Sequence, residues 1–369
     1  MGVSEHVQTA NSPRDGNPRR SDPEAGSPRV SVVLAMRNEG GFIDRTLQSL
    51  IDQDYPRERL EVLVVDGLSD DRGPDIVRAW QARHPHIVLL QNPQRRTPCG
   101  FNIGIRATSG DLIAIVSAHC ELASDYIRRC VEHLHSSGAD NVGGPMRPVA
   151  EGFWGRNINM ATSTPFGIGN SPFHYSQTEQ FVDTVYMGMY RRDMLERIGL
   201  FDETLVRNQD YELNYRLRAA GGKIFYTPAI RSWYHGRSSL RDLWSQYFQY
   251  GFWKARVIRL HPDSIRARHL AAPAFVLALI VSSVPAALYR PAAVLPALIL
   301  LAYATASAVS AAALAARHGW RYLWSLPVTF AAIHLSWGLG FWWSWVRWVM
   351  NGRKELTESA APPRLERRQ

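Results

Sequence analysis

Short apolar runs alternate with amphipathic stretches along the first 120 residues of the chain. Four runs rich in β-branched residues predict buried strands: Val30–Ala35, Glu61–Val65, Ile87–Leu90 and Leu112–Val116. Three stretches with apolar residues at helical spacing lie between them: Phe42–Ile51, Asp75–Trp80 and Gly100–Ala107. This alternation predicts βαβ units in an α/β domain with a mostly parallel central sheet, which binds ligands beyond the carboxyl ends of its strands.

The pattern beyond residue 150 is less regular. Residues 150–180 are rich in Gly, Pro, Ser and Asn, which predicts a long functional loop. Asp183–Tyr190 and Lys223–Thr227 predict strands, and Gln209–Ala220 predicts a short helix. Ser239–Ile258 is an amphipathic helix rich in aromatic residues. Its apolar face could lie in a membrane interface or pack on the preceding domain.

Three long apolar runs follow. Residues 271–289, 291–316 and 322–346 contain no Asp, Glu, Lys or Arg. Each is long enough, or nearly so, to cross a hydrocarbon core of about 30 Å as a helix. A buried helical hairpin in a soluble core is the alternative, but three successive runs favour a membrane.

The net charge of +9 is unevenly distributed. Between residues 231 and 269, eight basic side chains face only two acidic ones, directly before the first apolar run. This positive-inside pattern places the preceding domain in the cytosol and argues against nucleic acid as a partner, although an ordinary solvated basic face would look the same. The basic residues beyond 350 also favour the inside, so we expect one apolar run to be re-entrant or interfacial.

The N-terminal segment and the cysteines exclude two further classes. Residues 1–28 are polar and lack an apolar core, so we expect a disordered tail and no secretory signal. Cys99, Cys120 and Cys130 show no metal-binding spacing, and we expect reduced core thiols.

Candidate chemistry lies at four places. Asp66 ends the second predicted strand and could accept hydrogen bonds from a base or ribose, although an Asp-Gly turn is common. His119 follows the fourth strand and could bind a Mn²⁺-like ion or a phosphate, although a lone histidine is more often packed. Asp210 opens a short helix, where an acid is ordinary.

The fourth place is the start of the amphipathic helix. His235, Arg237 and Gln246 supply cationic or amide donors that could close over a diphosphate, and Arg237 could equally contact lipid headgroups. Glu212 and Arg216 form an i,i+4 pair that we interpret as structural.

Taken in order, these segments resemble the family 2 glycosyltransferases with the GT-A fold. The resemblance spans residues 29–258 and rests on Val30–Glu39, Glu61–Asp70, Asn102–Ile105, Gly110–Ile113, Phe201–Glu203 and Asn208–Leu213. Gln246–Gly251 is similar to a segment of the succinoglycan-type, ExoA-like branch, which also carries C-terminal membrane helices. The ordered set is specific, although each motif alone is not.

The resemblance implies a role for each matching residue. Asp66, with Glu39 nearby, would contact the nucleoside of a nucleotide-sugar donor, and Gln246 would lie near the donor diphosphate. Asp210 would be the general base that deprotonates the acceptor hydroxyl.

One motif departs from the family pattern. The family's metal motif falls on residues 117–119, where Ser117 replaces its first carboxylate. A divalent cation, Mn²⁺ or Mg²⁺, would then bind through His119, helped by the diphosphate and His235. If it does not bind, Arg95, Arg96 or Arg237 would neutralise the leaving group instead.

The resulting expectation is a membrane-anchored inverting glycosyltransferase of polysaccharide biosynthesis, multi-pass in the cytoplasmic (inner or plasma) membrane, with its catalytic domain cytosolic. Its acceptor would be a polyprenyl-diphosphate-linked glycan, and a polysaccharide assembly complex is a possible partner. The expected divisions are a tail (1–28), a GT-A domain (29–238), an interfacial helix region (239–269), transmembrane helices (270–349) and a C-terminal tail (350–369).

Three alternatives belong to other classes. The missing carboxylate at Ser117 also fits a catalytically weak nucleotide-sugar-binding or scaffold protein, against which Asp210 argues. A dinucleotide-dependent oxidoreductase would need a G-x-G-x-x-G turn after the first strand, which is lacking. A transporter is disfavoured because His334 is the only ionisable side chain, tyrosines aside, in the apolar runs.

Overall fold

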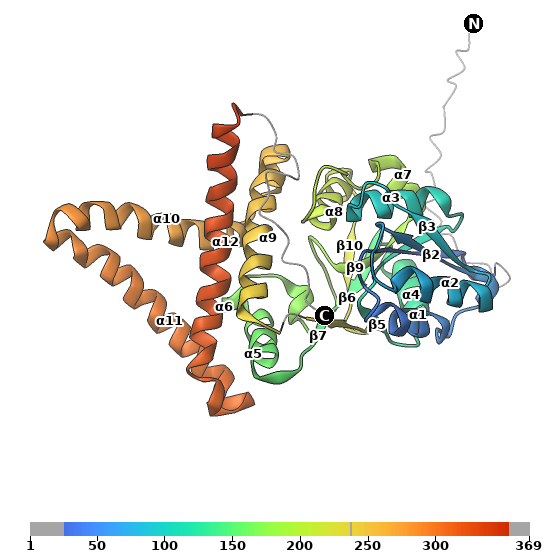
Figure 1. Ribbon diagram of the computed structural model, residues 1–369, viewed down its shortest axis with the longest axis horizontal. Helices are drawn as coiled ribbons and strands as arrows, with labels where there is room; N and C mark the ends of the chain where they lie inside the picture. Colours follow the sequence, from blue (N-terminus) through green and yellow to red (C-terminus); the bar gives the residue numbers. More distant parts are fainter. Residues whose placement is uncertain (1–25, 237, 354–369) are drawn as a thin grey trace, which may run out of the picture.

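The computed structural model describes residues 26–236 and 238–353. Most of the expected N-terminal tail, Arg237 and residues 354–369 lie outside these ranges. A layered α/β region carries the strands, and a group of helices, which includes residues 152–168 as well as the long C-terminal helices, stands beside it (Figure 1).

The central sheet has eight strands in the order β3-β2-β1-β4-β9-β6-β10-β8. Its strands are β1 (Val30–Met36), β2 (Leu60–Asp66), β3 (Ile87–Gln91), β4 (Leu112–Ser117), β6 (Asn141–Gly144), β8 (Gln180–Phe181), β9 (Tyr186–Arg191) and β10 (Ile224–Tyr226). β1 pairs in parallel with both β2 and β4, while β9 is antiparallel to β4 and β6. The mostly parallel α/β sheet predicted from the alternating pattern is therefore confirmed.

Helices cover both faces of this sheet. They are α1 (Ile43–Ile51), α2 (Gly73–Arg83), α3 (Thr97–Ala107), α4 (Tyr126–Ser137), α7 (Arg192–Ile198) and α8 (Gln209–Ala219), and η1 (Arg57–Arg59) precedes β2. Alternate residues of β1 point to opposite faces, as a strand requires. Val32 and Leu34 pack with α1, α2 and α4, whereas Val33 packs with α3, α7 and α8.

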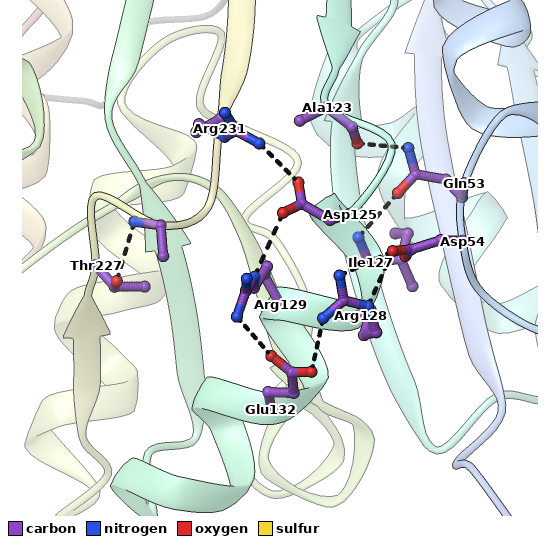
Figure 2. A network of polar contacts seen from close by, with 11 residues as sticks. Gln53, Asp54, Ala123, Asp125, Ile127, Arg128, Arg129, Glu132, Thr227 and Arg231 are labelled. Atoms are coloured by element: carbon purple, nitrogen blue, oxygen red, sulfur yellow. Dashed lines mark hydrogen bonds and ion pairs between the residues drawn. The ribbon is translucent and has the colours of Figure 1, made fainter.

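A second sheet adds three short strands in the order β5-β11-β7. They are β5 (Cys120–Leu122), β7 (Met146–Val149) and β11 (Ser232–His235). A polar network ties this sheet to α4 (Figure 2). Asp125 accepts hydrogen bonds from Arg129 and Arg231, and Gln53 donates to the Ala123 carbonyl at 2.8 Å. The network fixes the start of β11, and β11 carries Tyr234 and His235.

The segment predicted as a long loop is more structured than its composition indicated. It contains α5 (Gly152–Thr162), α6 (Pro165–Ile168) and η2 (Pro172–His174). Asn157 of α5 is fully buried, where it donates to Ser325 and accepts a hydrogen bond of 2.6 Å from Thr329. Tertiary contacts of this kind stabilise helices that a Gly-rich composition does not predict.

The amphipathic helix is α9 (Leu240–Leu260), and it packs along α12 (Ser325–Met350). Glycines allow this close approach: a Cβ at Gly251 would lie 2.1 Å from the Trp337 carbonyl oxygen, and one at Gly340 would lie 2.0 Å from that of Phe248. Another side of α9 packs on the α/β region, where Phe252 and Trp253 join Tyr211 in a buried cluster. Packing on the preceding domain, one of the two alternatives for this helix, is therefore present.

Two further long helices form a hairpin that projects away from α12 (Figure 1). They are α10 (Ala267–Leu288) and α11 (Val294–His318), joined by η4 (Arg290–Ala293); η3 (Pro262–Ser264) and η5 (Trp320–Tyr322) flank them. By length and composition, Ala267–Leu288 and Arg290–His318 are the two helical stretches, within residues 26–236 and 238–353, that could cross a membrane. The third apolar run lies in α12, which contacts α9 and α5.

Candidate active site

The polar segments predicted at the strand ends meet at one edge of the central sheet. Ala35 of β1 pairs with Val65 of β2 on one side and with Ser117 of β4 on the other. The chain segments that follow these three positions therefore leave the sheet together. This edge is the carboxyl end, where ligands bind in open α/β sheets.

Hydrogen bonds join the loops after β1 and β2. The Asn38 backbone N–H donates to Ser69 Oγ at 2.9 Å, and the Gly40 N–H donates to Asp71 Oδ2 at 2.7 Å. Ser69 Oγ in turn donates to Asp66 Oδ1 at 2.6 Å. Asp66 is 6% exposed and is turned toward Ser69, whereas Asp70 and Asp71 line the cleft described below.

Glu39 and His119 face each other at this edge. Glu39 Oε1 lies 3.2 Å from His119 Nδ1, and Ser117 Oγ lies 3.2 Å from the same ring. Both side chains are largely shielded, with 17% of Glu39 and 24% of His119 exposed. The carboxylate that stands beside His119 is therefore supplied by the loop after β1, and not by residue 117.

His235 occupies a neighbouring but separate environment. Its backbone N–H donates to the His119 carbonyl at 3.3 Å, while its Nε2 lies 3.1 Å from Glu121 Oε1. Over the described part of the chain, no three His, Cys, Asp or Glu side chains gather closely enough to hold a metal ion. The predicted set of His119 and His235 therefore does not form a metal site by itself, because their rings engage different carboxylates.

The start of α8 places Asp210 on the opposite side of the site. Asn208 caps the helix in a left-handed conformation, φ +59°, which asparagine tolerates better than most residues. Its side chain donates to the Tyr250 carbonyl of α9 at 3.1 Å. The Tyr211 N–H donates to Asp210 Oδ1 at 2.8 Å. Glu212 is buried and bonded to Arg216 at 2.7 Å, which confirms the structural pair.

The carboxyl group of Asp210 has an elevated pKa. Asp210 reaches solvent through the cleft, but protein atoms surround it closely, and this desolvation raises its pKa. The Tyr211 N–H and the positive charges of Lys254 and Arg207 oppose that rise. An elevated pKa is typical of a carboxylate that accepts a proton during catalysis.

One continuous cleft of about 2630 Å³ joins these elements. Five of the predicted site residues line it: Glu39, Ser117, His119, Asp210 and Gln246. Gln246 donates to the Tyr250 hydroxyl at 2.9 Å. Asp66 and His235 lie beside the cleft without lining it, and Arg237 is outside the described residues.

The cleft has a basic part and an apolar part. Its cationic lining comprises Arg37, Arg95, Arg96, Arg207, Arg241, Lys254 and Arg268. Its apolar arm runs between α6, α10, α11 and α12 and is lined by Phe166, Phe275, Ile299, Tyr303, Ile333 and Trp337. Lys254 and this arm were not recognised as site features in the sequence, although a lysine on the aromatic face of an amphipathic helix was a visible signal.

Comparison with known proteins identifies the family. The family model "Glycosyl transferase family 2" matches residues 31–199. A dolichyl N-acetyl-alpha-D-glucosaminyl phosphate 3-beta-D-2,3-diacetamido-2,3-dideoxy-beta-D-glucuronosyltransferase of Methanococcus voltae is 31% identical over 238 residues, which cover 62% of this chain and 74% of that protein. This chain belongs to glycosyltransferase family 2.

Two further similarities agree with this assignment. The succinoglycan biosynthesis protein ExoA of Rhizobium meliloti is 27% identical over 65% of this glycosyltransferase and 73% of ExoA. The mannosyltransferase PcManGT of Pyrobaculum calidifontis, solved with GDP-Man and Mn²⁺, aligns with a TM-score of 0.54 at 20% identity over 85% of this chain and 88% of that chain. The family and the GT-A fold predicted from the motifs are confirmed, and the protein is a glycosyltransferase.

Proposed function

We propose that this family 2 glycosyltransferase moves a sugar from a nucleotide-sugar donor to a hydroxyl of a lipid-linked glycan, with inversion and with Asp210 as the base. The observation that carries the proposal is a single cleft with the strand-end loops on one wall and a carboxylate of raised pKa on the other. An inverting transfer needs this arrangement, because the base must face the acceptor on the side opposite the leaving group.

Each wall has a part in the reaction. The loops bearing Glu39 and Asp66 hold the nucleoside, and Gln246 lies at the diphosphate. Asp210 takes the proton from the acceptor hydroxyl as its oxygen bonds to the anomeric carbon. The bond between that carbon and the diphosphate breaks, and the electron pair leaves with the nucleoside diphosphate.

In this proposal, arginine side chains neutralise the negative charge of the leaving diphosphate. In the described ranges, no three His, Cys, Asp or Glu side chains gather closely enough to hold a metal ion, whereas cationic side chains are abundant. Arg95 and Arg96 both line the cleft on the segment after β3, next to the nucleoside loops, and can neutralise a diphosphate. If a chelator abolishes transfer and Mn²⁺ restores it, this part of the proposal is wrong.

Two observations support a lipid-linked acceptor. The name of the Methanococcus voltae relative describes a transferase that acts on a dolichyl-linked phosphate. In this chain the cleft extends into the apolar arm between α10, α11 and α12, next to two helices that could cross a membrane. A cleft that is polar at one end and apolar at the other matches an acceptor with a sugar head and a hydrocarbon tail.

The same helices suggest a topology in the cytoplasmic membrane. Two crossings, by α10 and α11, would return the chain to its starting side and leave α12 beside α9. Both the catalytic domain and the basic residues beyond 350 would then be cytosolic, as the positive-inside rule favours. Three crossings would instead place the basic C-terminal segment outside, against the positive-inside rule.

Asp210→Asn tests the base directly. We expect kcat to fall about 10²- to 10⁴-fold while donor binding stays nearly unchanged. Asp193→Asn is a matched control, because Asp193 also opens a helix and accepts from the next backbone N–H at 2.8 Å, but does not line the cleft. A screen of nucleotide sugars, with and without Mn²⁺, supplies the donor for both variants.

The departure at Ser117, and the absence of a three-residue metal cluster from the described part of the chain, favour a second candidate, a nucleotide-sugar-binding scaffold in a polysaccharide assembly complex. A scaffold would bind the donor without hydrolysing or transferring its sugar. Donor binding without turnover in the wild-type protein would therefore favour the scaffold. Turnover that depends on Asp210 would exclude it.

A further inference from the structure

Lys254 is a buried cation on α9 that the reaction outlined above does not use. The residue is 3% exposed, yet it lines the cleft. Its Nζ lies 3.1 Å from the centroid of the Tyr211 ring. Among the residues that the structure describes, no oxygen atom accepts a hydrogen bond from it. A buried ammonium group without hydrogen-bonded oxygens is costly, so its presence in the cleft calls for an explanation.

The charges around Lys254 are only partly balanced. Asp210 of α8 attracts its ammonium group, and Asp183 does so more weakly. Asp183 already forms an ion pair with Arg268, whose side chain also donates to the Asn170 carbonyl at 2.9 Å. Burial lowers the pKa of Lys254 to about 7. This depression means that the surrounding anions do not compensate for the lost hydration.

Lys254 lies where the catalytic part of the cleft meets the apolar arm. Gln246, Tyr250 and Lys254 follow at four-residue steps on α9, and all three line the cleft. Asp210 attracts the ammonium group of Lys254 and Arg268 of α10 repels it, and both of these residues also line the cleft. Phe275, two turns further along α10, lines the arm.

We propose that Lys254, assisted by Arg268, binds the phosphate group of the lipid-linked acceptor and thereby sets the distance between the reacting sugar and the membrane. The proposal rests on the proposed function, because it divides one cleft between a donor and a lipid-linked acceptor. In an inverting transfer the leaving diphosphate departs on the side away from the base. A cation coupled to Asp210 therefore serves the acceptor, whereas Arg95 and Arg96 serve the donor.

Binding measurements on the full chain in detergent test this assignment. The probes are geranylgeranyl diphosphate, geranylgeraniol, which has the tail without the charge, and inorganic pyrophosphate, which has the charge without the tail. We expect Lys254→Gln to weaken binding of geranylgeranyl diphosphate about 10- to 100-fold, since an ionic hydrogen bond is lost. Binding of geranylgeraniol and of nucleoside diphosphate should not change.

Lys223→Gln is the matched control, because Lys223 is exposed and does not line the cleft. Equal weakening by both substitutions would mean a general charge effect and would overturn the proposal. Weaker binding of nucleoside diphosphate, or its displacement by geranylgeranyl diphosphate, would assign Lys254 to the donor and would also overturn it. Pyrophosphate binding as tight as that of the lipid would show an anion site unrelated to a lipid.

A measurement on the unaltered protein covers the case in which the Gln variant fails to fold. Affinity for geranylgeranyl diphosphate should fall relative to that for nucleoside diphosphate as the pH rises through 7, because Lys254 loses its proton while both diphosphates ionise alike. A ratio of the two affinities that does not change with pH overturns the assignment. The proposed function fails separately: if wild-type protein binds the lipid but transfers no sugar, the anion site stands and the transferase reaction does not.

Discussion

The two parts of the cleft are built by different physical means. The strand-end part is held by hydrogen bonds between loops, such as Asn38 to Ser69 and Gly40 to Asp71. The helix-lined part is held by close packing, with Gly251 and Gly340 bringing α9 and α12 together. Directional bonds fix the positions of polar groups, whereas close packing suits an apolar arm, where few polar groups are available. We therefore expect a substitution in one part of the cleft to leave the other part unchanged.

Among changes outside the proposed base, the largest effect should come from Gly340→Ala, which disturbs the packing of the helix-lined part. The added Cβ would meet the Phe248 carbonyl oxygen, and the backbone cannot yield cheaply. We expect the free energy of unfolding to fall by about 3 kcal/mol, measured by thermal or denaturant unfolding in detergent. Gly155→Ala in α5, where a Cβ has ordinary clearance of 3.4 Å, should be neutral or stabilising. If Gly340→Ala and Gly155→Ala lower the free energy of unfolding equally, the close α9–α12 contact does not explain the effect.

The pH dependence of kcat and of the acceptor KM should distinguish Asp210 from Lys254. If Asp210 is the base, as proposed, it must be ionised to act, so kcat should fall about tenfold per pH unit below the pKa of Asp210, which burial raises above that of an ordinary aspartate. Lys254 binds an anion only when protonated, so the acceptor KM should rise above about pH 7. If kcat begins to fall only at pH 4 or lower, the pKa of Asp210 is not raised by desolvation.

Arg95→Gln should weaken the donor side alone. Removing one cation that lines the cleft at the strand ends should raise the donor KM about tenfold and leave the acceptor KM unchanged. Arg78→Gln, an exposed arginine on α2, is the control. If the donor KM is unaltered by Arg95→Gln but rises on chelation, a metal ion carries the diphosphate charge instead.

The smallest effect should come from filling the apolar arm. Ala302→Trp places a large ring in the arm from α11, and we expect the acceptor KM to rise about fivefold with the donor KM unchanged. Ala304→Trp, two residues away and exposed outside the cleft, should have no effect. An unchanged acceptor KM in both variants would mean that the lipid tail does not enter this arm.

Much of the α/β region could be predicted because its signals are local. The β1, β2 and β4 segments were located within one or two residues, since buried parallel strands are short β-branched runs. The residue 117–119 motif was found because it follows such a strand directly, and Asp210 was found because it opens a short helix. The helices α5 and α6 were missed because their stability comes from contacts with α12, more than 150 residues away, which no local pattern reveals.

The linear order of strands, helices and apolar runs determined the family, the α/β class and a candidate base, because these depend on residue type and periodicity. Only the tertiary structure decided which side chains meet. It paired His119 with Glu39 and His235 with Glu121, and it buried Lys254 on a helix far from Asp210 in the sequence. These pairings depend on contacts between residues tens to more than a hundred positions apart, and burial, which sets the pKa values, exists only after the chain has packed.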